Sequence, residues 1–167
     1  TYTWSVTASN GQTIASGTDT TFDFTPNDNG TYTVTLSVND GDGGVTTDSK
    51  TITVNNVAPS VAILGAPEST AEGSLVSFVG SAFDPASVND ALTYLWDFGD
   101  GSAGVYGANT EYIYSDNGTY LVTLTVTDGD GGSTTISRSI TVTNVAPTAT
   151  LAGATTSTTG ATVTIVS

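Results

Sequence analysis

The sequence predicts an all-β protein, built of antiparallel β-sandwiches that repeat along the chain, and three observations lead to this fold class. Apolar and polar residues alternate, so that Tyr120, Val122, Leu124 and Val126 fall on one side of a strand and threonines on the other. Glycines and Asn-Gly or Asp-Gly pairs interrupt the chain at short intervals, and no helical periodicity is present. Whole segments recur after 88 residues. We expect about seven short strands in each repeat.

The recurring segments divide the chain into parts. "DNGTYTVTLSVNDGDGGVTT" (Asp28–Thr47) matches "DNGTYLVTLTVTDGDGGSTT" (Asp116–Thr135), and "PSVAILGA" returns near the C-terminus as "PTATLAGA". We expect residues 1–57 to form a divergent module that lacks its N-terminal strands, and residues 58–146 to form a complete module. Residues 147–167 would hold the first strands of a third. This arrangement predicts a section of a longer repetitive polypeptide.

Within residues 58–146, the strands follow from the alternation and from the turns between the alternating segments. The expected strands are Val61–Leu64, Leu75–Ala82, Leu92–Phe98, Glu111–Tyr114, Thr119–Asp128 and Thr134–Thr143. By the same repeat, Thr1–Trp4 should correspond to Thr93–Trp96. The segment Val163–Ser167 should correspond to the strand near Val76–Gly80.

Two positions indicate that the sandwich is Ig-like. Tyr120 lies two residues before Val122, which occupies the place of the second cysteine of an immunoglobulin domain, and this is the spacing of a tyrosine corner. Trp96 falls where such domains bury a tryptophan. The first module keeps the corner at Asp28, Gly30 and Tyr32. The sequence therefore predicts tandem Ig-like sandwiches.

Two longer motifs resemble those of the PKD (polycystic kidney disease) domain family. "YLWDFGDGSAG" (Tyr94–Gly104) is similar to the family's aromatic-Asp-Phe-Gly-Asp-Gly signature. "EYIYSDNGTYLVTLTVTDGDGG" (Glu111–Gly132) contains its Tyr-x-x-x-Gly-x-Tyr-x-Val-x-Leu-x-Val pattern. The resemblance covers roughly residues 58–146. It has departures: Tyr112 stands where the family often has histidine, and "WSVTASNGQTIASG" replaces the signature in the first module.

The resemblance implies an Ig-like fold and a role outside the cell. PKD domains serve as spacers, as adhesion or force-bearing elements, and as accessory domains of secreted hydrolases. Some bacterial members bind calcium near the start of the domain.

The composition of the chain limits its partners. Among 167 residues, 16 are acidic and 2 (Lys50 and Arg138) are basic, which gives a net charge of −14. This charge disfavours nucleic acid and anionic membranes as partners and favours cations. Cysteine, methionine and histidine are absent, so disulfides, thiolate chemistry and histidine-based catalysis are excluded. Hard oxygen ligands remain, and these suit calcium or magnesium.

The motif DGDGG, at Asp40–Gly44 and again at Asp128–Gly132, has three interpretations. An EF-hand-like loop needs suitable ligands at its positions 5 and 12, where Gly132 and Ser139 stand, so this interpretation fails. The second is a glycine-rich turn between two strands, with solvated aspartates.

The third interpretation is a calcium site where modules join. In an Ig-like sandwich, the turn 128–132 and the loop 84–90 lie at the end where the first strand enters. Oxygens from both segments and from the linker would converge there, with carbonyls and water completing the six to eight ligands of calcium. The candidate ligands are Asn55, Asn56, Asp84, Asp90, Asp128 and Asp130, with Asp40 and Asp42 for the equivalent site of the first module. The turn and the calcium site both stay open as interpretations.

Other residues give weaker hypotheses. A catalytic role for Asp97 and Asp100 is disfavoured, because Gly-Asp-Gly is turn chemistry and no supporting polar groups accompany the pair. Asn29 and Asn117 match the N-glycosylation pattern, but Asn-Gly is also a common hairpin dipeptide. Three tyrosines form either an exposed binding row or packing contacts: Tyr106, Tyr112 and Tyr114.

These inferences favour a non-enzymatic spacer of an extracellular surface protein, in a stalk or filament whose junctions calcium stiffens. Its partners would be the neighbouring modules of the same chain. One alternative is an adhesion or carbohydrate- or protein-binding accessory module of a secreted protein. Another is a fibre subunit in which copies of the chain exchange strands.

Overall fold

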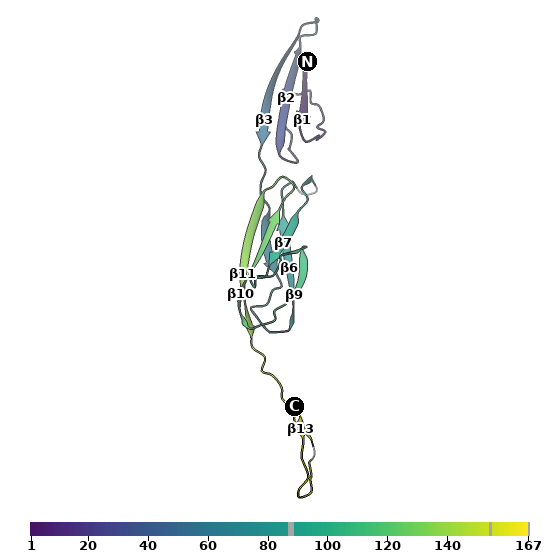
Figure 1. Cartoon of the computed structure of the whole chain (residues 1–167). Helices are drawn as coiled ribbons and strands as arrows, with labels where there is room; N and C mark the ends of the chain where they lie inside the picture. The colour runs from purple at the N-terminus through teal and green to yellow at the C-terminus, as the bar shows by residue number, and fades with distance from the viewer. Residues whose placement is uncertain (87–88, 154, 167) are drawn as a thin grey trace.

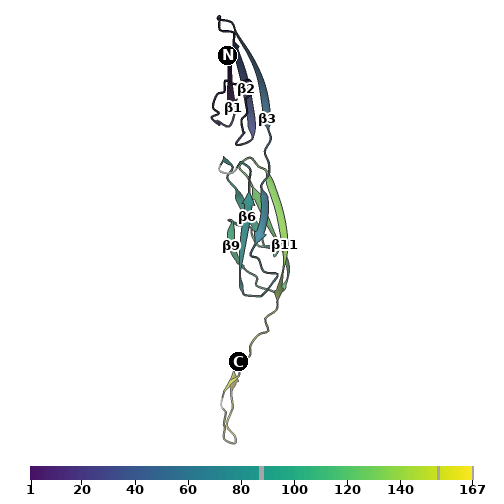
Figure 2. The same ribbon diagram turned by 180° about the vertical axis from the view of Figure 1, so that it is seen from behind.

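The computed structural model describes residues 1–86, 89–153 and 155–166. The chain consists of β-strands and loops, and its three parts follow one another in a row: an N-terminal sheet, a β-sandwich and a C-terminal pair of short strands (Figures 1 and 2). This architecture confirms the predicted all-β fold with antiparallel sheets. In the part of the chain that the structure describes, no helix is long and apolar enough to cross a membrane.

Three antiparallel strands form the N-terminal sheet. In spatial order they are β1 (Tyr2–Ala8), β2 (Gly30–Asn39) and β3 (Val45–Val54). Trp4 lies opposite Leu36 in this sheet, and Trp96 lies opposite Leu124, the residue 88 positions later, in the sandwich. Trp4 therefore takes the place of Trp96, which confirms the predicted correspondence between the two segments.

Two sheets packed face to face form the sandwich. One has the order β4-β6-β9 and the other the order β5-β11-β10-β7-β8. Their strands are β4 (Ser60–Leu64), β5 (Ser69–Ala71), β6 (Leu75–Phe83), β7 (Thr93–Asp97), β8 (Val105–Tyr106), β9 (Asn109–Ile113), β10 (Gly118–Thr127) and β11 (Ser133–Thr143). Every pair is antiparallel except β5 with β11. The sequence did not predict β5 and β8, because strands of two or three residues show no alternation.

The core between the two sheets is aromatic. Trp96 and Phe78 are fully buried with their ring centroids 5.6 Å apart, and the indole N–H of Trp96 donates to the carbonyl of Gly107 at 2.9 Å. Gly80 leaves room for this packing, because a Cβ there would lie 2.8 Å from Leu124 Cδ2. The predicted buried tryptophan of an Ig-like domain is confirmed at Trp96.

The N-terminal sheet presents the equivalent apolar face, but no second sheet covers it among the described residues. Ile52 on β3 is 39% exposed, whereas Ile140, its counterpart in the sandwich, is 1% exposed. The segment between β1 and β2 covers part of this face, where Phe22 stacks on Trp4 with ring centroids 5.9 Å apart. The N-terminal module is therefore packed less completely than the sandwich.

The C-terminal part contains one antiparallel pair, β12 (Ala152–Gly153) with β13 (Ile165–Val166). The sequence predicted a longer strand over Val163–Ser167, of which Ser167 lies outside the described residues. Leu151 beside this pair is 79% exposed. The pairing is short because no second sheet buries its apolar side chains in the described part of the chain.

Both modules contain the predicted tyrosine corner. The hydroxyl of Tyr32 donates to the backbone carbonyl of Asp28 at 2.8 Å, and that of Tyr120 donates to Asp116 at 3.0 Å. In the N-terminal module the corner holds the loop 26–29, which faces the sandwich: the side-chain amide of Asn89 donates to the carbonyl of Asn27 at 3.1 Å.

Candidate metal site at the module junction

Four segments meet where the N-terminal sheet adjoins the sandwich. They are the corner loop 26–29, the linker 55–59, the loop between β6 and β7, of which the structure describes residues 84–86 and 89–90, and the turn 128–132 between β10 and β11 (Figure 1). A groove of about 100 Å³ lies between the corner loop, the linker and the loop 84–90. The sequence predicted the last three segments at one end of the sandwich, and the structure brings them together there.

DGDGG forms the same closed turn in both modules. The Oδ1 atom of Asp128 accepts hydrogen bonds from the backbone N–H of Asp130 at 3.1 Å and of Gly132 at 2.7 Å. Asp40 accepts the equivalent bonds from Asp42 at 2.9 Å and from Gly44 at 3.0 Å. The turn interpretation of the motif is therefore correct for its local structure.

The environment of this turn differs between the two modules. Asp128 is 6% exposed, and its Oδ2 atom accepts a hydrogen bond from the Asn56 amide at 2.8 Å. Burial alone would raise the pKa of Asp128, but this bond and the backbone N–H groups outweigh burial and lower it. Gly132 is required here, because a Cβ would lie 2.6 Å from Asn56 Nδ2 and 3.1 Å from Ala58 Cα. Asp40, by contrast, is exposed.

Two further carboxylates are buried beside Asp128. Asp84 and Asp90 are each 3% exposed. One oxygen of each accepts a backbone hydrogen bond, from Ala86 at 2.8 Å for Asp84 and from Gly129 at 3.0 Å for Asp90. The second oxygen of each, Oδ2, is buried without a hydrogen-bond partner among the described residues. Unpaired buried carboxylate oxygens are energetically costly, and a positively charged partner would offset that cost.

Asp84, Asp90 and Asp128 form a group that we name the inner triad. One oxygen of each lies within 4.8 Å of the others. Burial, followed by the charges of the surrounding carboxylates, raises the pKa of Asp90. Those carboxylates are Asp130, Asp28, Asp128 and Asp84. Three hard oxygen ligands at this spacing are suited to a divalent cation such as calcium.

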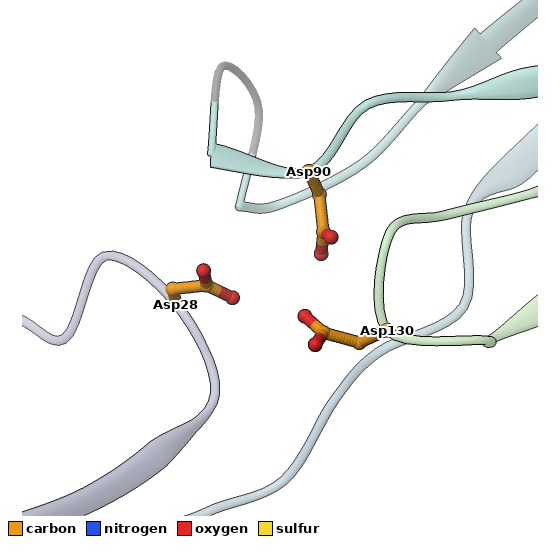
Figure 3. A group of neighbouring side chains, drawn as sticks. All are labelled: Asp28, Asp90 and Asp130. Atoms are coloured by element: carbon orange, nitrogen blue, oxygen red, sulfur yellow. The ribbon is translucent and has the colours of Figure 1, made fainter. Parts of the chain in front are cut away.

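A second group, which we name the bridging triad, consists of Asp28, Asp90 and Asp130 (Figure 3). The sequence predicts Asp90 and Asp130 as ligands but not Asp28, whose motif is explained by the tyrosine corner. The fold topology could have identified Asp28 as a ligand. The corner loop lies at the end of its module that adjoins the next module, so its acidic residue faces the next module's loops.

The remaining predicted ligands have different positions. Asn56 contacts the inner triad through Asp128, whereas Asn55 is exposed and lines the groove. Asp40 and Asp42 are exposed in the turn of the N-terminal sheet, and no acidic group of three includes them among the described residues. The equivalent site of the first module would require a counterpart of the loop between β6 and β7, and the described residues include none near Asp40 and Asp42.

The other candidate residues have structural contacts. Asp97 and Asp100 each accept a backbone hydrogen bond within the turn that follows β7, from Gly99 at 2.8 Å and from Ser102 at 3.0 Å. The three tyrosines do not form an exposed row. Tyr114 is 1% exposed and Tyr112 stacks on Phe98 with ring centroids 3.9 Å apart, while Tyr106 is 69% exposed.

We expect Tyr112→Phe to destabilise the sandwich in a pH-dependent way. Burial alone would raise the pKa of Asp100, but hydrogen bonds from Tyr112, at 2.5 Å, and from Ser102 outweigh burial and lower it. A lowered carboxylate pKa stabilises the fold above the unfolded value of about 3.9, and this contribution is lost as the pH falls through the folded value. The cost should be about 1 kcal/mol at pH 7, since Asp100 is exposed to solvent.

Urea denaturation at pH 7 and at pH 3 measures this difference. Tyr106→Phe is the matched control, because Tyr106 is exposed and should tolerate the loss of its hydroxyl at both pH values. A cost for Tyr112→Phe that is the same at pH 7 and pH 3 would contradict the role of the Asp100 carboxylate.

Comparison with known proteins identifies the sandwich. The sequence profile of the PKD domain matches residues 56–143, more than half of the chain. The pre-pro-metalloprotease PrtV of Vibrio cholerae is 37% identical over 91 residues, which are 54% of this chain and 9% of PrtV. Collagenase ColA of Bacillus cereus is 41% identical over 51 residues, which are 30% of this chain and 5% of ColA. The chain thus spans less than a tenth of either relative's length.

One solved structure that is similar to the chain is a PKD domain of the same protease. The PKD1 domain of PrtV is 32% identical, with a TM-score of 0.40, and the match covers 52% of this chain and 98% of that domain. The matched residues include Trp96, the Gly-Asp-Gly turn and the tyrosine corner at Tyr120, which carried the resemblance in the sequence. Because the sequence profile of the PKD domain matches residues 56–143, more than half of the chain, the chain belongs to the PKD domain family.

Proposed function

We propose that the chain is a non-catalytic spacer of a larger extracellular protein, that the inner triad binds a calcium ion which stabilises the fold, and that calcium bound at the junction stiffens the array of modules. The observation that carries the calcium site is the pair of buried oxygens, Asp84 Oδ2 and Asp90 Oδ2, that have no hydrogen-bond partner in the part of the chain that the structure describes. A divalent cation between them would compensate both charges and remove the cost of burying them.

The chemistry of the ligands favours calcium over other cations. The inner triad offers only oxygens, which excludes a preference for softer metals. Calcium accepts six to eight oxygens in flexible geometry, whereas magnesium requires a tighter octahedron and keeps several waters. Asn56 directs its amide nitrogen at Asp128, and a half-turn of that amide would offer its oxygen instead. Backbone carbonyls of the loops and water from the groove would complete the calcium shell.

The spacer role rests on the arrangement of the modules. The modules follow one another in a row (Figure 2), and β10 has 10 residues, which corresponds to roughly 33 Å of length. The linker ends at Pro59, which is fully buried and limits the freedom of the junction. PrtV and ColA carry their matching segments within much longer chains, which supports a role as one part of a larger protein. Adhesion and glycan binding stay predictions.

Thermal unfolding of the full chain in millimolar calcium, and again in excess chelator, tests this proposal. We expect calcium to raise the midpoint by several degrees, because an ion that binds only the folded state adds about 2.7 kcal/mol at a hundred times its Kd. Asp128→Asn should remove most of this rise. The matched control is Asp40→Asn in the exposed turn of the N-terminal module, which should leave the rise unchanged. Identical curves for the wild type in calcium and in chelator would overturn the calcium site.

A further inference from the structure

The bridging triad connects the two modules directly. Asp28 comes from the corner loop of the N-terminal module, Asp90 from the loop 84–90, and Asp130 from the turn 128–132. One oxygen of each lies within 4.8 Å of the others, and Figure 3 shows the three carboxylates pointing toward a common centre. We propose that this triad binds a second divalent cation, which holds the N-terminal module against the sandwich. The proposal rests on the proposed function only through Asp90, which belongs to both triads.

The buried side chain of Asp90 is the first observation that points to a ligand here. It is 3% exposed, and its Oδ2 atom has no hydrogen-bond partner within residues 1–86, 89–153 and 155–166, while Oδ1 accepts one bond from Gly129. A carboxylate with two oxygens is able to bridge two cations, as in two-metal sites whose ions lie about 3.5–4 Å apart. Asp90 is therefore placed to serve an ion on the inner side and another at the junction.

Asn29 is the second observation, because its side chain offers a fourth oxygen to the same centre. With its nitrogen turned toward the triad, it donates to Asp130 Oδ2 at 2.8 Å and to Asp28 Oδ1 at 2.8 Å. A half-turn of the amide puts its oxygen at the same place, and an amide oxygen is a calcium ligand. Without a cation, the Asn29 nitrogen is the favourable atom at this centre, because it donates hydrogen bonds to two carboxylates. With a cation bound, the Asn29 oxygen is favourable, because it is able to coordinate the ion.

The charge of the junction calls for more than one cation. Five carboxylates influence one another there, and they are Asp28, Asp84, Asp90, Asp128 and Asp130. The two basic residues of the chain, Lys50 and Arg138, lie in the middle of β3 and β11 rather than in these loops. One divalent cation leaves an excess of three negative charges, and a second reduces the excess to one. The second ion therefore removes repulsion that the first leaves in place.

The two modules contact each other at this point, so the ligands of the site need little rearrangement to bind an ion, although an exposed hydrogen bond alone does not hold the junction rigid. Asn89 in the loop 84–90 donates to the carbonyl of Asn27 in the corner loop at 3.1 Å. The tyrosine corner holds Asp28 itself, because the Tyr32 hydroxyl donates to its backbone carbonyl. A cation at the bridging triad would thus add strength to a preformed contact between modules.

The repeat supplies a matched control residue. Asp116 is the counterpart of Asp28: it lies in the second tyrosine corner and likewise accepts a hydrogen bond from the next backbone N–H, at 2.9 Å as against 2.7 Å. No acidic group of three includes Asp116 among the described residues. Replacing either aspartate by asparagine keeps the shape of the corner and removes one charge.

Calcium titration calorimetry on the full chain, with small-angle scattering in calcium and in chelator, tests the proposal. Four proteins are compared: the wild type, Asp28→Asn, Asp84→Asn and Asp116→Asn. We expect two ions per wild-type chain and two for Asp116→Asn. Asp28→Asn should bind one ion and keep the calcium-dependent rise of the unfolding midpoint. For Asp28→Asn, the distribution of interatomic distances from scattering should be as broad in calcium as in chelator. For the wild type, this distribution should be narrower in calcium than in chelator.

The outcomes separate this proposal from the proposed function. If Asp28→Asn binds as many calcium ions as the wild type with the same affinity, the proposal of a second cation is overturned. In that case, loss of the calcium-dependent midpoint rise in Asp84→Asn still supports the inner site. If Asp84→Asn keeps the wild-type midpoint rise and Asp28→Asn loses an ion, the bridging site stands and the inner site fails. A wild type that binds no calcium overturns both.

Discussion

Trp96→Ala is expected to destabilise the sandwich by about 3–5 kcal/mol, a large part of the stability of a domain of this size. Trp96 is fully buried between the two sheets, where it contacts Phe78 and pairs across the strands with Leu124. Truncation leaves a cavity that the sheets are unable to close, and it leaves the carbonyl of Gly107 without its indole donor. Urea denaturation followed by circular dichroism measures the loss.

Trp4→Ala is the internal control for this prediction, because Trp4 occupies the same position in the N-terminal sheet. Its indole N–H also donates to a backbone carbonyl, that of Asp19, at 2.9 Å. Trp4 is only half-buried, so its truncation leaves no closed cavity and should cost less than half as much. Equal costs for the two variants would show that the face of the N-terminal sheet is as well covered as that of the sandwich.

Asp90→Asn is expected to have effects of opposite sign with and without calcium. In chelator at pH 7, the variant should be more stable than the wild type by about 1 kcal/mol, because it removes one of several mutually repelling carboxylates. Its remaining oxygen still accepts the hydrogen bond from Gly129. In calcium the variant should be less stable, because it lacks a ligand of both triads and loses stabilisation of about 2.7 kcal/mol or more.

Thermal unfolding midpoints of both proteins in both buffers test this inversion. Asp42→Asn is the control, since Asp42 is an exposed aspartate in a turn with the same motif, and its midpoint should follow that of the wild type throughout. A variant that is less stable than the wild type in chelator as well would show that the Asp90 carboxylate stabilises the fold without an ion.

The sequence was sufficient to predict the fold and the inner triad. Two features made this work: a repeat of mostly 88 residues, which aligned the strands, and the topology of an Ig-like sandwich, which places the loop between β6 and β7 beside the turn 128–132. The DGDGG motif was misleading for Asp40 and Asp42, because an identical sequence does not reveal which other loops surround the turn.

Asp28 was not predicted as a ligand for a different reason. Its motif, Asp-Asn-Gly-Thr-Tyr, is fully explained by the tyrosine corner, so no unexplained residue remained to suggest a second role. Its contact with Asp90 and Asp130 depends on how one module rests on the next, and no periodicity in the chain encodes that orientation. The same limit applies to β5 and β8, which form only because longer strands offer them an edge.

The membership of Asp90 in both triads has a consequence for how an array of such modules would respond to its surroundings. Two cations on one carboxylate repel each other, so the second ion binds at a higher calcium concentration than the first. Folding stability and junction rigidity would then have separate thresholds. In dilute calcium the modules would be folded but free to move at the junction, and in concentrated calcium the junction would become rigid. The end-to-end length of an array would then depend on the calcium concentration.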